Sequence, residues 1–234
     1  MIICESPQGS PEWYQDRAGA ITGSMFSEVR KRLKSGQNKG DFTNEAKKYA
    51  FELAIERVTG KALQDDQFET YAMKRGHFLE PDARAAHEAR HGVMVIRAGF
   101  IKTDDGKFGC SADGLIDLRG GGISEYKCFV NPEKLSNIIL ENDWSEVRDQ
   151  VQGGLWLTGR KWAHYGLYCP DLACVGLDLV VHEEDRDEAY IEELEQDLVV
   201  FDRLVEDYRC RILERAPIAP IVNAPEPEEL ESIF

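Results

Sequence analysis

The sequence has no apolar segment long enough to cross a membrane. Its longest apolar run is CVGLDLVV at 174–181, whereas a membrane helix needs about 20 such residues. The first residues, MIICESPQGSPEW, also lack the charged stretch followed by an apolar stretch that marks a secretory signal. We therefore expect no membrane association and a cytoplasmic location.

Closely spaced cysteine pairs are also missing. The six cysteines of the 234 residues are scattered, and no two of them form a CxxC pair. A zinc ribbon or a dense disulfide framework would require such spacing. We expect reduced, mostly buried thiols.

Positive charge is scarce overall, with a net charge of −15. Its distribution is uneven, since residues 183–234 hold 17 acidic and 5 basic side chains, whereas residues 17–48 hold eight basic and three acidic ones. A polyanion could bind to this basic stretch, because phosphate binding depends on Lys and Arg. A solvated helix face explains the same charges equally well.

The order of predicted elements indicates an α/β fold with a central mixed β-sheet flanked by helices. We expect one domain over residues 1–215 and an acidic, Pro-rich tail over residues 216–234. The chain is predicted to run through helices at 22–34, 43–60 and on both sides of Pro81, a three-strand meander at 93–130, helices from 131 and at 144–159, strands at 161–169 and 174–182, and a last helix.

The last predicted helix carries an apolar stripe with alternating spacings of three and four. Such a stripe packs either on the protein's own sheet or on a neighbouring molecule, and packing within the chain is the more common case. Its members are Ile191, Leu194, Leu198, Phe201, Val205, Tyr208 and Ile212.

The stretch GGISEYKCF at 121–129 places two charged residues on one face of a predicted strand, because side chains at alternate positions point the same way. These residues are Glu125 and Lys127, and Asp113 precedes Glu125 by twelve residues, across a glycine turn at 120–122. Two carboxylates on adjacent strands can share Mg²⁺, with the Tyr126 backbone carbonyl as a third oxygen. For an isolated E-x-K, a plain ion pair is the commoner explanation.

Four further stretches extend this pattern, and one of them adds Glu80 on a helix upstream. The five pieces, in order, are WYQDRAGAITGS (13–24), GHFLEPDAR (76–84), CSADGL (110–115), EYKC (125–128) and QVQGGLWLT (150–158). Together they resemble the PD-(D/E)XK nuclease core and, within it, the phage lambda exonuclease-like branch of YqaJ-like viral recombinases. The usual proline before the metal-binding aspartate is Ala112 here, and that proline is not a ligand.

The resemblance implies a catalytic set of Asp113, Glu125, Lys127 and Glu80. Asp113, Glu125 and the Tyr126 carbonyl would hold one Mg²⁺, Glu80 would help to hold a second, and Mn²⁺ could replace either ion. Lys127 would assist the attacking water. A two-metal hydrolysis of a phosphodiester follows.

The resemblance also implies a pocket for the 5′-phosphate of a DNA end, formed by Arg17, Ser24, Ser111 and Gln152. A guanidinium can hold phosphate through two hydrogen bonds. Ser24 as a helix cap and Gln152 as a surface amide remain alternatives. Met73 is the candidate wedge that separates the strands, with a buried core methionine as its alternative.

The function that the resemblance implies is a 5′-to-3′ double-strand DNA exonuclease of phage recombination. It would release mononucleotides, leave a 3′ overhang, act as a homotrimeric ring in a bacterial host, and cooperate with a single-strand annealing recombinase. A structure-selective endonuclease on the same core and a non-catalytic clamp on DNA ends are the alternatives.

A competing motif is HEARH at 87–91, which satisfies the H-E-x-x-H pattern of zinc proteases. Gly92 ends the helix at once, and the longer metzincin extension is missing because Met94 and Arg97 stand in its place. We therefore expect a solvent-exposed histidine pair at a helix end rather than a protease.

Overall fold

The structure is a computed structural model that describes residues 1–63, 71–129 and 131–217, apart from the side chain of Met73. Most of the predicted tail, residues 218–234, lies outside this part of the chain. No helix among the described residues is both long and apolar enough to span a membrane.

The described strands form two four-stranded sheets, and each sheet contains one parallel and two antiparallel pairings. The first sheet has the order β1-β3-β4-β2, with bounds Ile2–Cys4, Phe100–Lys102, Phe108–Cys110 and Ile21–Thr22. The second has the order β5-β6-β7-β8, with bounds Gly114–Ile116, Gly122–Lys127, Trp162–Tyr168 and Leu179–Asp185. The predicted fold class, α/β with mixed sheet flanked by helices, is confirmed.

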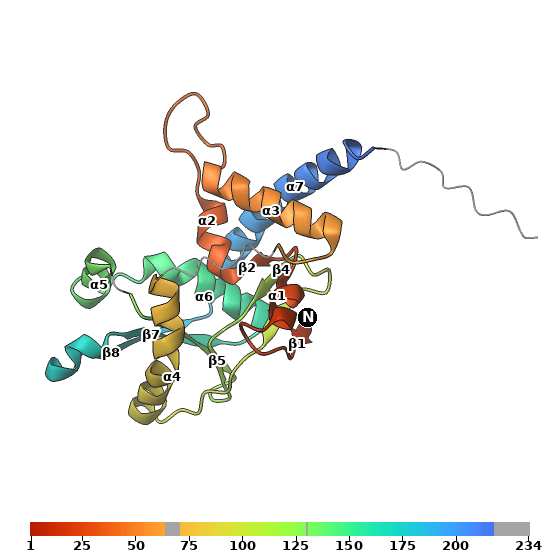
Figure 1. Cartoon of the computed structure of the whole chain (residues 1–234). Helices are drawn as coiled ribbons and strands as arrows, with labels where there is room; N and C mark the ends of the chain where they lie inside the picture. Colours follow the sequence, from red (N-terminus) through yellow and green to blue (C-terminus); the bar gives the residue numbers. More distant parts are fainter. Residues whose placement is uncertain (64–70, 130, 218–234) are drawn as a thin grey trace, which may run out of the picture.

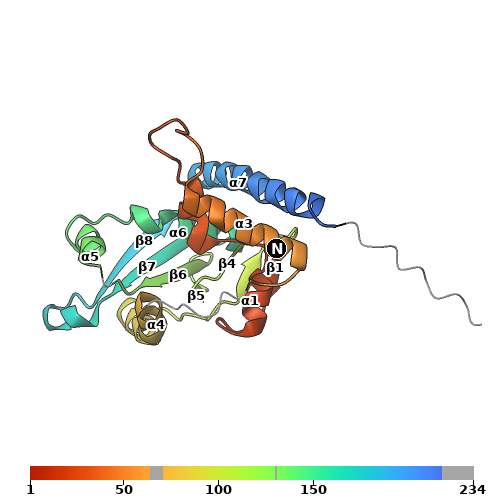
Figure 2. The same cartoon turned by 45° about the horizontal axis from the view of Figure 1, so that its top comes forward.

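The helices surround these sheets. Their bounds are α1 Pro11–Arg17, α2 Phe26–Arg30, α3 Asn44–Thr59, α4 Tyr71–His91, α5 Pro132–Ile139, α6 Ser145–Thr158 and α7 Glu188–Glu214, with short 3₁₀ helices η1 Gly23–Met25 and η2 Pro170–Val175. Figures 1 and 2 show α4 on one face of the second sheet and α6 on the other.

The signals at the ends of α3 act as predicted. The Thr43 hydroxyl accepts a hydrogen bond from the backbone N–H of Ala46, and Gly60 ends the helix at φ 66°. A left-handed φ of this kind favours glycine. Ser24, in contrast, lies inside η1, so the interpretation of Ser24 as a helix cap is wrong.

Two details of the predicted element order are wrong. Residues 93–130 do not form a three-strand meander, since the middle run splits into β4 and β5, which belong to different sheets. The chain around Pro81 forms one continuous helix, α4, although an interior proline lacks a backbone N–H and tends to kink helices. Packing of α4 on the second sheet offsets this cost, because Leu79, Ala83 and His87 form a buried stripe with a spacing of four.

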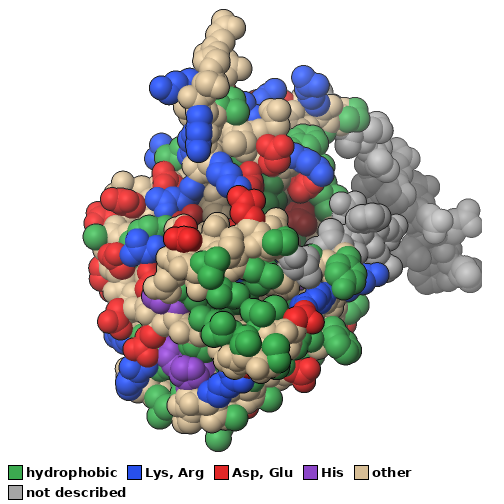
Figure 3. Space-filling model, turned by 90° about the vertical axis from the view of Figure 1, so that its left-hand side faces the viewer, with side chains coloured by type: hydrophobic (Ala, Val, Ile, Leu, Met, Phe, Trp, Pro, Cys, Tyr) green, Lys and Arg blue, Asp and Glu red, His purple; other side chains and the backbone are tan. Residues whose placement is uncertain are grey.

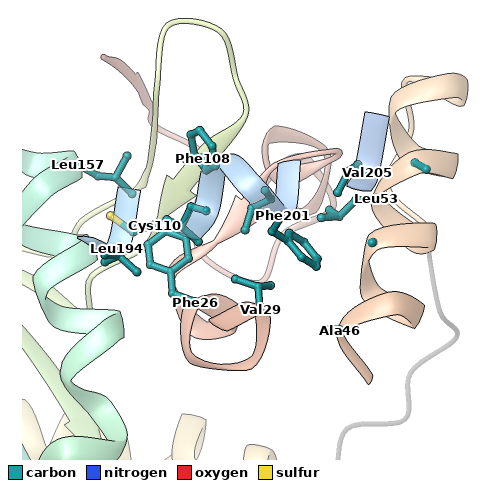
Figure 4. Packing of buried hydrophobic residues seen from close by; sticks show 14 of the residues in the cluster. Phe26, Val29, Ala46, Leu53, Phe108, Cys110, Leu157, Leu194, Phe201 and Val205 are labelled. Carbon is teal, nitrogen blue, oxygen red and sulfur yellow. The ribbon is translucent and has the colours of Figure 1, made fainter. Parts of the chain in front are cut away.

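The largest apolar core lies between the first sheet and the helices α2, α3, α6 and α7. The predicted stripe on α7 supplies four of its buried residues, Leu194, Leu198, Phe201 and Val205, and Figure 4 shows Leu194, Phe201 and Val205 among them. Packing of this stripe within the chain is therefore confirmed. Its main partner is α3 rather than a sheet alone, and Figure 2 shows the two helices side by side.

Candidate active site

A cavity of about 1150 Å³ collects most of the residues predicted to be functional. It opens beside the second sheet, between α1, α4 and α6. Its lining includes the four predicted catalytic residues and three of the four predicted phosphate-binding residues, namely Glu80, Asp113, Glu125, Lys127, Arg17, Ser24 and Ser111.

The β5–β6 hairpin positions the two carboxylates at the base of this cavity. Its antiparallel register pairs Gly114 with Ser124, so Asp113 and Glu125 are the next opposed positions. The turn includes Gly120 and Gly121 at φ 82° and 96°, which glycine adopts without strain. The Asp113 carboxylate also accepts a hydrogen bond from the Tyr126 backbone N–H at 2.7 Å, which fixes it beside β6.

Glu125 and Lys127 point from β6 towards α6. The Lys127 Nζ lies 2.9 Å from the Glu125 Oε1 and 2.8 Å from the Gln150 Oε1, and the Gln150 amide donates to the same Glu125 oxygen. Gln150 completes this triangle although the sequence interpretation missed it. Its position in QVQGGLWLT was the available signal.

Negative charge accumulates at this site beyond what its lysine can neutralise. Burial, together with the charges of Glu125 and Glu80, raises the pKa of Asp113 well above its usual value. Burial alone would lower the pKa of Lys127, but the charges of Glu125 and Asp113 outweigh it and raise that pKa. Half-buried and buried carboxylates gathered around one ammonium group suit a hard divalent cation, which is bound through oxygen.

Glu80 reaches the cavity from α4 and forms an ion pair with Arg84, one helical turn later. Arg84 also donates to the Asp113 backbone carbonyl at 3.4 Å, so it links the helix to the hairpin. The sequence interpretation missed Arg84 as well, although it ends the stretch GHFLEPDAR.

Arg17 and Ser111 are held on the other side of the cavity by one aromatic ring. The Arg17 guanidinium lies 4.0 Å from the centre of the Trp13 ring, and the Trp13 indole N–H donates to the Ser111 hydroxyl at 3.0 Å. Burial lowers the pKa of Arg17. No carboxylate among the described residues forms an ion pair with Arg17, and a partly buried guanidinium of this kind suits an anion. Ser24 is exposed at the same cavity.

Gln152 does not reach the cavity, contrary to its predicted place in the phosphate pocket. It is fully buried on α6, where its amide donates to the Glu184 carboxylate and the Asp185 carbonyl at 2.9 Å each and accepts from the Asp187 N–H at 3.0 Å. Two positions along a helix differ by about 200°, so Gln150 and Gln152 face opposite ways. The structure therefore brings Gln150 to the cavity, and the alternative interpretation of Gln152 as a surface amide is also wrong.

Met73 lies in the first turn of α4. Its side chain is outside the described residues, so its predicted role as a wedge stays a prediction.

Half of the eight basic residues in the stretch at 17–48 form ion pairs with acidic side chains among the described residues. Arg30 pairs with Asp149 and Asp197. Three lysines of the stretch form further ion pairs, which are Lys31–Glu28, Lys47–Asp41 and Lys48–Glu52. Figure 3 shows acidic and basic side chains interspersed over one face of the molecule. Arg17 is the member of the stretch that lines the cavity.

The HEARH motif does not form an exposed histidine pair. His91 is exposed, but His87 is fully buried at the interface of α4 with the second sheet. The Glu88 carboxylate accepts a hydrogen bond from the Val95 N–H at 2.8 Å, so it closes the loop after α4 instead of facing a substrate. This arrangement does not favour the protease alternative.

Comparison with known proteins agrees with this site. The model of the YqaJ-like viral recombinase domain matches residues 12–161. None of the curated proteins compared with the chain matches it.

Solved structures share this fold over most of the chain. The alkaline exonuclease LHK-Exo from Laribacter hongkongensis matches with a TM-score of 0.70 and 27% identity over 88% of this chain and 97% of that one. Its complex with dAMP matches with a TM-score of 0.71 at 27% identity, over 88% and 100% of the two chains. A phage-related exonuclease from Haemophilus somnus 129PT has the same fold, with a TM-score of 0.63 and 16% identity over 84% and 96%. The chain belongs to the YqaJ-like viral recombinase family.

Proposed function

We propose that this chain, a deoxyribonuclease, degrades one strand of duplex DNA from its 5′ end, releases mononucleotides and leaves a 3′ overhang. The observation that carries the proposal is the cluster of Asp113 and the buried Glu125 beside Lys127, in a cavity that Arg17 also lines. The family and the likeness to alkaline exonucleases support DNA cleavage. The polarity rests on the predicted 5′-phosphate pocket.

The residues of this site fit Mg²⁺. Asp113 and Glu125 would hold one ion with the Tyr126 carbonyl, and Glu80 would contribute to a second, for which it must release Arg84. The bound ions would supply positive charge that stabilises the phosphorane-like transition state and the leaving oxygen. Mn²⁺ has similar ligand preferences and could replace them.

Lys127 is the side chain of this site that would act on the attacking water. The Lys127 ammonium, held by Glu125 and Gln150, can orient the attacking water and stabilise charge on a phosphate oxygen. The charges of Glu125 and Asp113 raise the pKa of Lys127 and so favour its charged form, which donates hydrogen bonds.

The predicted 5′-phosphate pocket would set where cleavage starts. Arg17 and Ser111, positioned through Trp13, can supply a bidentate charged donor and a hydroxyl to a terminal phosphate. Ser24 adds a hydroxyl, and Gln150 lines the cavity whereas Gln152 does not.

Assembly and partners belong to the same proposal. A homotrimeric ring would surround the DNA, and a single-strand annealing recombinase would take over the exposed strand in the cytoplasm of a bacterial host. Because the net charge is −15, a ring must turn its least acidic surface towards the phosphates.

Digestion of linear and covalently closed duplexes in Mg²⁺ tests the proposed function. We expect nucleotides to be released from the linear duplex only. Cutting of closed circles would replace the proposal with a structure-selective endonuclease. Binding of DNA ends without any release would indicate a non-catalytic clamp.

The 5′-phosphate preference is tested with linear duplexes that differ only in that phosphate. We expect faster degradation of the phosphorylated duplex by the unmodified protein and loss of this ratio in Arg17→Ala. Lys34→Ala, which removes an exposed positive charge from the same basic stretch but outside the cavity, is the matched control. An unchanged ratio in Arg17→Ala would reject the pocket.

A further inference from the structure

Three histidines cluster on the side of the second sheet that faces away from α6. His87 and His91 lie one turn apart on α4, and His164 lies on β7. The ring centres of the three pairs are 5.2, 5.0 and 5.4 Å apart. One ring nitrogen from each histidine lies within 4.8 Å of the other two.

We propose that His87, His91 and His164 bind a transition-metal cation, with Zn²⁺ as the best fit, and that this ion fastens α4 to the sheet. Imidazole is a preferred ligand of Zn²⁺, and three imidazoles with one water complete its tetrahedral shell. His87 and His164 are buried, whereas His91 is exposed. The ion would therefore enter from the His91 side, where a water can take the fourth position.

The distances require the His87 and His164 nitrogens to separate slightly and the His91 nitrogen to move closer to both. Two nitrogens bound to one tetrahedral Zn²⁺ at about 2.0 Å lie about 3.3 Å apart. The His87 Nε2 and His164 Nδ1 are 2.8 Å apart and would separate slightly. The exposed His91 ring would move inwards by rotation about its own side-chain bonds.

The nitrogens that do not face the cluster already have the partners that a metal site needs. The His164 Nε2 lies 2.9 Å from the Glu183 carboxylate, and the His87 Nδ1 lies 2.8 Å from the Tyr126 hydroxyl. Histidines that bind metals usually donate their other N–H to such an oxygen, which fixes the ring and its tautomer. The Arg119 guanidinium donates to both Glu183 carboxylate oxygens at 2.8 Å and so fixes this carboxylate in place.

The proton balance is simple. Without metal, the network is closed if Tyr126 donates to the His87 Nδ1 and the His87 Nε2–H donates to the His164 Nδ1. On binding, the proton of His87 moves to Nδ1, the Tyr126 hydroxyl turns to accept it, and both facing nitrogens become ligands. The His87 ring is buried between Tyr126 and His164, and burial favours the neutral form of imidazole that binds metals.

The site lies apart from the carboxylate cavity but shares two elements with it. His87 follows Glu80 by two turns on α4, and Tyr126 is adjacent to Glu125 on β6. Figure 1 shows α4 beside β7, the strand that carries His164. A bound ion would therefore stabilise the helix that brings Glu80 to the cavity, and this inference does not depend on the proposed nuclease function.

A Zn²⁺ titration of the full chain in excess Mg²⁺, followed by competition with a chromogenic chelator, tests the proposal. The Mg²⁺ masks the carboxylate cavity. We expect one Zn²⁺ per chain with submicromolar affinity and a raised unfolding temperature. His91→Ala, an exposed position that leaves the core intact, should weaken binding by at least a hundredfold and remove the thermal shift. His182→Gln, on β8 outside the cluster, should change neither result.

Two results would overturn the proposal. The first is a full chain that binds no Zn²⁺ in Mg²⁺, which would leave the cluster as a hydrogen-bonded network only. The second is an His91→Ala variant that binds Zn²⁺ as tightly as the unmodified chain, which would place the ion elsewhere. Circular dichroism of both proteins confirms that the comparison is made between folded chains.

Discussion

The two faces of strand β6 carry ionisable side chains in opposite circumstances. On the face towards α6, Glu125 and Lys127 border a cavity where the pKa of Asp113 is raised by burial and by like charges. On the face towards α4, Tyr126 joins a buried chain of neutral hydrogen-bonded rings, His87 and His164. Paired buried polar groups stabilise a fold, whereas like charges held together cost stability and are retained where they serve function. The face of β6 towards α6 therefore carries groups that serve cleavage, and the face towards α4 carries groups that stabilise the fold.

The largest effect is expected for Asp113→Asn. This change tests whether the cavity face of β6 is needed for cleavage although it lowers the stability of the fold. Loss of a metal-binding carboxylate should remove several kcal/mol of transition-state stabilisation and slow cleavage by about a thousandfold or more. The same change removes charge repulsion, so the unfolding temperature in EDTA should stay level or rise. Steady-state cleavage and thermal unfolding measure the two effects. A large fall in both would show that Asp113 is mainly structural.

Lys127→Ala should slow cleavage by about a hundredfold, within the range for a positioned donor in a transition state. The change falls on kcat rather than KM if Lys127 acts on the water and not on DNA binding. Single-turnover cleavage at saturating enzyme separates the two. Lys134→Ala, which removes another lysine from the cavity lining, is the control and should retain most of the activity.

The matched pair Gln152→Ala and Gln150→Ala distinguishes a residue of α6 that stabilises the fold from one that contributes to activity. Gln152→Ala leaves the N–H of Asp187 without its partner and should destabilise the fold by about 2 kcal/mol. Gln150→Ala frees Lys127 from one partner and should reduce activity with little change in stability. Urea unfolding and cleavage assays on both variants check the assignment, and the reverse pattern would restore Gln152 to the phosphate pocket.

Tyr126→Phe should have the smallest effect. It removes one hydroxyl from the His87 nitrogen and should lower the free energy of unfolding by about 1 kcal/mol. Cleavage should persist, since the backbone of residue 126 is unchanged. A loss of activity comparable with that of Lys127→Ala would show that the two faces do not act separately.

Short-range patterns predicted the parts of the site that one hairpin or one helix determines. The alternation of β6 and the glycine turn were enough to place Asp113 opposite Glu125, because register follows from the turn. The capping signals of α3 likewise depend on adjacent residues.

Features that depend on tertiary packing could not be predicted in this way. The choice between Gln150 and Gln152 needs the rotation of α6 about its axis, which is set by what it packs against. The continuity of α4 through Pro81 needs the sheet beneath it. The burial of His87 needs His164, which is 77 residues away in the chain and carries no local signal. The division of the run at 108–116 into β4 and β5, which belong to different sheets, likewise cannot be predicted from the alternation of side chains.

The assignment of 5′-to-3′ exonuclease chemistry to the cavity face is tested most directly by the first product released from a linear duplex. Duplexes labelled at either the 5′-terminal or the 3′-terminal nucleotide are cleaved in Mg²⁺ by the unmodified chain and by Lys127→Ala under single-turnover conditions. We predict that the 5′ label appears first, as a mononucleotide, and that its release is about a hundredfold slower in Lys127→Ala. Earlier release of the 3′ label, or equal rates for the two proteins, would contradict the assignment.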